Sequence, residues 1–182
     1  MEEQLSELTT YSNAVWVLVS AALVFVMHAG FALVESGFCR RKNAVMVLMK
    51  NFGVVAISSL VFYLVGYGVI FGEGNAFMGL ASFFPENGGA DADLPPYVFL
   101  FFQLVFAATA CTIVSGAIAE RGRLLTFFVF TAVATMIIYP VVGHWVWGGG
   151  WLSERGCVDF AGSPDVHGDG GGKARPGARL NG

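Results

Sequence analysis

Four long apolar runs set the strongest limit on how this chain can fold. A helix needs about 20 mostly apolar residues to cross the hydrocarbon core of a bilayer, and backbone polar groups in lipid must be paired within the segment. Charged residues make up only 13% of the chain, well below the roughly 25% of a soluble domain. The sequence therefore predicts an all-α membrane protein with four transmembrane helices, at residues 14–34, 46–71, 97–119 and 124–147.

The distribution of charge along the chain predicts its orientation. Basic residues follow the first span (Arg40, Arg41 and Lys42) and the third (Arg121 and Arg123). The acidic N-terminus, residues 1–13, and the acidic connection at residues 73–94 carry no basic residue. Since cytoplasmic loops are enriched in Lys and Arg, the N-terminus is expected outside a plasma or inner membrane. We interpret the basic clusters as topology determinants, with binding sites for anionic lipids as the alternative.

The sequence gives no support for an enzyme or a metalloprotein. Its three cysteines, Cys39, Cys111 and Cys157, fall at different depths of the expected topology, so neither a disulfide nor a zinc site is supported. It has no nucleophile–base pair, and Gly148–Gly150 lacks the strand context of a phosphate-binding loop. No cofactor, metal or nucleic-acid partner is therefore expected.

Two phenylalanines in the third span are candidates for lining a transport path. Phe102 and Phe106 are four residues apart and share one helix face. Two neighbouring rings suit a hydrophobic gate or a cation–π surface, whereas ordinary packing is the alternative in a chain with 17 phenylalanines. The same helix is rich in small residues, which allow close helix approach, so it is expected inside a bundle.

Aromatic residues also gather where the fourth span ends. Trp147 stands next to Gly148–Gly150, and it has two interpretations. It belongs either to the aromatic belt of the membrane interface or to a cation vestibule, where an open and mobile glycine backbone would expose the indole face. His144 is expected to be structural, and Trp145 and Trp151 fit the belt.

Further polar candidates lie beyond the fourth span and within earlier ones. Asp159 is either a helix N-cap or a functional acid in the membrane. His167 follows eight residues later; its imidazole either passes a proton or is structural. His28 is expected to pack and to hydrogen-bond internally, and Lys50 is expected to snorkel toward the cytoplasmic surface.

Five motifs in a fixed order make a stronger signal than any single residue. They are Met27–Phe38 with Arg41–Asn43, Phe71–Asn75, Phe102–Phe106 through Ser115–Arg121, His144–Gly150 and Asp159–Gly162. Together they resemble the N-terminal portion of the ammonium transporter (Amt/Rh) family over about residues 14–167. The resemblance implies homotrimers of eleven-helix protomers built from inverted halves, with ammonium or ammonia as substrate and the lipid bilayer as surroundings. Residues 14–162 would form the membrane domain, as part of the first half.

The resemblance also implies a role for each candidate residue. Trp147 and Phe102 would line an outer site that recruits ammonium, and Phe106 would be one ring of a hydrophobic gate. Asp159 would support the recruitment site and assist deprotonation. His167 would be the first of two pore histidines that conduct ammonia and its proton.

The last twenty residues, 163–182, do not continue the resemblance. The family has an apolar fifth helix here, whereas this segment is rich in glycine and charge and is expected to be flexible coil. We therefore expect a truncated or frameshifted transporter that lacks the second pore histidine and the site for a PII-type regulator. Such a chain is expected to conduct no ammonium alone. The alternative function is a non-transporting membrane sensor or interaction subunit.

Overall fold

The computed structural model describes residues 2–81 and 94–157 of the chain. Within these ranges every regular element is a helix, apart from one isolated bridge between Gly74 and Gly79. In chain order the elements are α1 (Glu2–Phe38), η1 (Arg41–Asn43), α2 (Ala44–Val61), η2 (Phe62–Gly66), α3 (Tyr67–Phe71), α4 (Pro96–Ile118), α5 (Leu124–Val133), η3 (Ala134–Ile138), α6 (Tyr139–Val146) and α7 (Trp151–Glu154). The predicted all-α architecture is confirmed.

These elements join into four rods that are long and apolar enough to cross a membrane, as predicted. The rods are Gln4–Phe38, Arg41–Phe71, Pro96–Ile118 and Leu124–Glu154. α1 is longer than the expected span because its acidic start continues the helix. Residues 2–13 contain no Pro or Gly, so no helix-breaking residue interrupts this segment.

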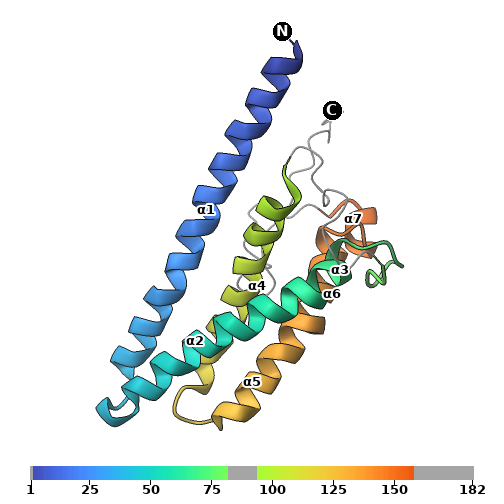
Figure 1. The fold of residues 1–182 in the computed structure, drawn as a ribbon. Coiled ribbons are helices and arrows are strands. Elements are labelled where there is room, and N and C mark those ends of the chain that lie inside the picture. Colours follow the sequence, from blue (N-terminus) through green and yellow to red (C-terminus); the bar gives the residue numbers. More distant parts are fainter. Residues whose placement is uncertain (1, 82–93, 158–182) are drawn as a thin grey trace.

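α4 is the central helix of the bundle (Figure 1). It packs against α1 and against α2, and α2 in turn contacts α5. α4 is the most buried of the four rods and α1 the least, since small residues such as Ala107, Ala108 and Ser115, all buried, let neighbouring helices approach α4 closely. The bundle has two ends: the η1 end holds η1 and the α4–α5 turn, and the α7 end holds α7 and residues 72–81.

Wide π-helical turns interrupt the second and fourth rods where these rods pack together. In η3, just before Pro140, the Tyr139 N–H bonds to the Ala134 carbonyl, five residues back. Pro140 has no N–H, and in an ordinary helix its ring would clash with a carbonyl four residues before it. Opposite η3, a side chain at Gly66 would place its Cβ 2.8 Å from the Thr135 carbonyl oxygen. The close contact between the two turns therefore requires glycine at this position.

Candidate functional site

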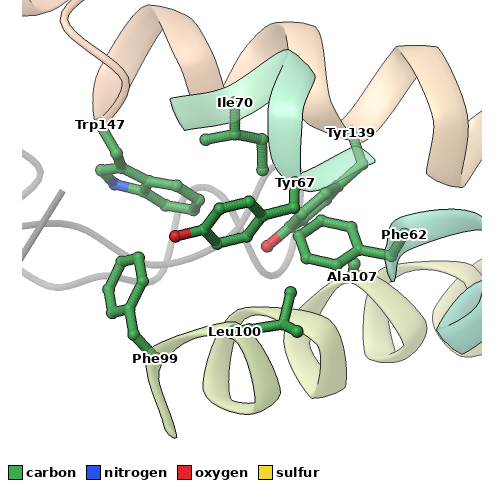
Figure 2. Packing of buried hydrophobic residues seen from close by; sticks show 8 residues of the cluster. All are labelled: Phe62, Tyr67, Ile70, Phe99, Leu100, Ala107, Tyr139 and Trp147. Carbon is green, nitrogen blue, oxygen red and sulfur yellow. The ribbon is translucent and has the colours of Figure 1, made fainter. Parts of the chain in front are cut away.

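An aromatic cluster fills the α7 end of the bundle and contains Trp147. Its members are Phe62, Tyr67, Ile70, Phe99, Leu100, Ala107, Tyr139 and Trp147 (Figure 2). The Trp147 side chain is buried, and its ring lies 6.5 Å from that of Tyr139 in an edge-on arrangement. Figure 2 shows the Tyr67 hydroxyl directed toward the side of the cluster where Trp147 and Phe99 lie. Among the described residues, neither the Tyr67 hydroxyl nor Trp147 Nε1 has a hydrogen-bond partner.

Two of the three glycines after Trp147, Gly148 and Gly150, do not form the open backbone that the vestibule interpretation supposes. A side chain at Gly148 would collide with the Ile70 carbonyl and with His144. A side chain at Gly150 would place its Cβ 2.8 Å from the His144 carbonyl and 2.9 Å from that of Ala76. Gly148 and Gly150 are therefore needed for close packing against the preceding helix and residues 72–81, whereas a Cβ at Gly149, whose φ is 86°, would meet nothing within 4 Å.

His144 ties α6 to the end of the second rod. Its Nδ1 lies 2.6 Å from the Ile70 carbonyl oxygen, and its Nε2 lies 2.9 Å from that of Asn75. A neutral imidazole can donate from only one nitrogen, whereas an imidazolium can donate from both. The ring is buried, and Trp145 Nε1 adds a bond of 2.9 Å to the Phe77 carbonyl. His144 therefore has the structural role that the sequence predicts.

Phe102 and Phe106 lie together on α4. Their ring centroids are 4.9 Å apart in a T-shaped arrangement, and both side chains are half-buried. Phe99, three residues before Phe102, belongs to the same cluster as Trp147. α4 thus carries both the Phe102–Phe106 pair and two members of the aromatic cluster, Phe99 and Leu100. Asp159 and His167 lie outside the described residues.

His28 packs in the middle of the bundle, between α1 and α4. Its Nδ1 lies 3.1 Å from the carbonyl oxygens of both Val24 and Phe25. Its Nε2 faces the Thr109 hydroxyl at 3.4 Å, and the ring is buried. The predicted internal hydrogen bonding of His28 is confirmed.

A buried ionic cluster at the η1 end was not expected. Lys50 Nζ lies 3.0 Å from Glu35 Oε2 and donates a hydrogen bond of 2.9 Å to the Ser115 carbonyl. Asn51 Nδ2 and the Ser115 hydroxyl each donate to the same Glu35 oxygen at 3.1 Å. The expectation that Lys50 snorkels to the surface is therefore wrong. The sequence signal was available: opposite charges stand at similar depths on two helices joined by a short turn.

A second polar contact joins the two turns at the η1 end. Glu120, whose φ of 62° is in the left-handed region, accepts hydrogen bonds on one carboxylate oxygen from Asn43 Nδ2 at 2.7 Å and from the Arg40 backbone N–H at 2.9 Å. Arg40 Nε approaches the same oxygen at 3.3 Å. The Asn43 bond, followed by the contacts with Arg40, holds the pKa of Glu120 below its ordinary value.

Comparison with known proteins identifies the family. The sequence profile of the Ammonium Transporter Family matches residues 15–174. Ammonium transporter Amt2 of Archaeoglobus fulgidus is 45% identical over 168 residues, which are 86% of this chain and 36% of that protein. Ammonium transporter 3 of Dictyostelium discoideum is 42% identical over 160 residues, again 86% of this chain and 36% of that protein. These relatives are transporters and not enzymes.

Solved structures agree with the sequence comparison. A protein described as a sensor Amt protein matches with a TM-score of 0.81 and 40% identity over 91% of this chain and 42% of its own. Mep2 of Saccharomyces cerevisiae matches with a TM-score of 0.74 and 32% identity over 85% of this chain and 36% of its own. The chain thus spans little more than a third of the length of its curated relatives. It is a multi-pass membrane protein that belongs to the ammonium transporter family.

Proposed function

We propose that this chain supplies four helices of an ammonium-conducting membrane domain. The observation that carries the proposal is the T-shaped Phe102–Phe106 pair, half-buried on the same helix that contributes Phe99 and Leu100 to the cluster containing Trp147. Such a surface is apolar along its length and offers ring faces to a cation. The alternative of a non-transporting sensor or interaction subunit is not favoured, because the matching family profile and curated relatives are those of transporters.

Recruitment of ammonium is the first proposed step. Trp147 and Phe102 attract the ion through their ring faces. Cation–π attraction is about 2 kcal/mol or more when the site is desolvated, and the burial of Trp147 supports this setting. Asp159 assists by its charge and by taking up hydrogen bonds, a role that rests on the family resemblance alone. Potassium cannot donate hydrogen bonds, which favours ammonium.

Deprotonation and passage follow. Phe106 forms one ring of a hydrophobic gate that an ion crosses poorly and that neutral ammonia crosses more easily. His167, by its resemblance to the first pore histidine, would accept and return a proton near physiological pH. The separation of ammonia from its proton lowers the desolvation penalty of moving a charge through an apolar constriction.

Orientation and assembly complete the proposal. Basic residues at the η1 end support a cytoplasmic position for that end, with the N-terminus and the α7 end outside a plasma or inner membrane. Large apolar side chains on α1, including Trp16, Leu23 and Leu33, are exposed in the isolated chain. This surface suits lipid or another protomer, and a homotrimer of the longer family protein would bury part of it.

A chimera provides the test. Residues 14–157 would replace the matching segment of Archaeoglobus Amt2, and ammonium uptake into proteoliposomes would be measured. We expect uptake by the chimera and a loss of about tenfold or more on Trp147→Ala, with Trp145→Ala as the matched control. A chimera that inserts and assembles but carries no ammonium would refute the proposal.

A further inference from the structure

The side chain of His144 completes the C-terminal end of α3. The last carbonyls of a helix have no partner within the helix, and in α3 they find partners elsewhere. The Val69 carbonyl accepts the Gly79 N–H at 2.9 Å, and the Ile70 carbonyl oxygen lies 2.6 Å from His144 Nδ1. Two lone pairs at such a short distance would repel, so Nδ1 carries a proton and donates it. A residue of α6 thus caps the end of α3.

The backbone of His144 holds the segment that follows Trp147. Its carbonyl accepts the N–H groups of both Gly148 and Gly150, each at 3.0 Å. The Trp147 N–H itself donates to the Gly143 carbonyl at 2.8 Å. His144 therefore joins two parts of the structure, since its ring binds the end of α3 and its carbonyl binds the backbone beside Trp147.

α3 in turn supplies part of the surroundings of the Trp147 ring. Tyr67 and Ile70 belong to the aromatic cluster that contains Trp147 (Figure 2). A Cβ built at Gly143 would lie 3.1 Å from Ile70 Cδ1 and 3.4 Å from Trp147 Cε3, so the isoleucine side chain and the indole both lie over this glycine. The place of the ring therefore depends on how α6 is aligned with α3, and His144 makes a direct contact between these two helices.

We propose that His144 is a positioning residue for ammonium recruitment, which fixes the Trp147 indole through its bond to the Ile70 carbonyl. The inference rests on the proposed function, in which Trp147 attracts the ion. Cation–π attraction requires the ion to lie over the ring face, and a ring already held in one orientation binds without a further cost of ordering. The Ile70 contact carries this role, because Ile70 belongs to the cluster and Asn75 does not.

Two amide variants separate the two contacts of the imidazole. In His144→Asn the amide nitrogen can occupy the place of Nδ1 and keep the bond to the Ile70 carbonyl. In His144→Gln the longer side chain brings the amide nitrogen to the place of Nε2, where it can keep the bond to the Asn75 carbonyl. Each variant loses one of two contacts, so a purely structural role would make them alike. Trp145→Phe is the control, since it removes another bond to residues 72–81.

The first measurement is ¹⁹F NMR of the full chain in lipid nanodiscs, with its four tryptophans replaced by fluorotryptophan. Trp147→Phe assigns the Trp147 signal by its loss. We expect a single Trp147 signal in the wild type, in His144→Asn and in Trp145→Phe. In His144→Gln the signal should broaden or split, because the ring is no longer held in one orientation.

The second measurement is ammonium uptake by the chimera described above. We expect His144→Gln to raise the ammonium concentration for half-maximal uptake about fivefold, as partial loss of one cation–π contact would, with the maximal rate largely kept. His144→Asn should stay near the wild type. In a Trp147→Ala background His144→Gln should add no further change, because the two residues act through one ring.

Three outcomes would overturn the inference. They are an unchanged Trp147 signal in His144→Gln, equal effects of His144→Asn and His144→Gln, and an undiminished effect of His144→Gln on uptake in the Trp147→Ala background. Failure of the proposed function has a different signature. Trp147→Ala alone would then leave uptake unchanged, whereas the ¹⁹F comparison would still decide whether His144 fixes the ring.

Discussion

The two ends of the bundle bury polar groups in opposite ways. At the α7 end, rings surround Trp147 and Tyr67, and the polar atoms of both side chains have no partner among the described residues. At the η1 end, a full ion pair is buried, and backbone and side-chain groups surround it. The aromatic cluster at the α7 end is stabilised mainly by the burial of apolar side-chain surface, and few of its buried atoms are polar. The η1 end depends on specific partners, so the loss of one partner should have a larger effect there.

The backbone contacts follow the same division. At the α7 end, His144 and close-packed glycines join α6 to residues 72–81 through main-chain carbonyls. At the η1 end, the Glu120 side chain joins the two turns through donors on Arg40 and Asn43. The contact at the η1 end thus depends on a carboxylate whose pKa the fold lowers.

Breaking the buried ion pair should have the largest effect. Lys50→Met leaves the Glu35 carboxylate buried without its counter-charge, so we expect a loss of about 3–5 kcal/mol in the free energy of unfolding. Denaturant titration of the purified protein in detergent would measure it. The double variant Glu35→Gln with Lys50→Met removes both charges and should recover most of that loss. A double variant as unstable as Lys50→Met would show that the packing of the lysine chain, and not charge, dominates.

Removing the His144 ring should have an intermediate effect at the α7 end. His144→Ala leaves the carbonyls of Ile70 and Asn75 without their partner and opens a cavity. We expect a loss of roughly 2–3 kcal/mol in the free energy of unfolding. Trp145→Phe is the milder comparison, since it removes one exposed hydrogen bond to the Phe77 carbonyl. If both variants were equally unstable, His144 would not be the main connection between α6 and residues 72–81.

The sequence predicts what depends on local pattern and misses what depends on the register between helices. The four helices were predictable because their apolar length is a local property. The Phe102–Phe106 contact was predictable because residues four apart on a helix are neighbours. The Glu35–Lys50 pair was missed because it depends on how α1 and α2 align across their turn. The close packing of Gly148 and Gly150 was not predicted, because a mobile backbone and a closely packed one both favour glycine.

Acid should have the smallest effect, and it should act on the contact between the turns at the η1 end. The folded state lowers the pKa of Glu120 below its ordinary value of 4.5, chiefly through the Asn43 hydrogen bond. This contribution to stability is therefore complete above that pH, and it is lost as the pH falls through the lower pKa of the folded state.

In Glu120→Gln the stability difference from wild type should shrink toward zero as the pH is lowered through this window. Thermal unfolding of both proteins at pH values from neutral to about 3 would measure the difference. Arg123→Gln, in the same turn, is the control because its exposed side chain is not part of the contact. A difference that stayed constant with pH would mean that the ionised carboxylate contributes nothing that an amide cannot replace.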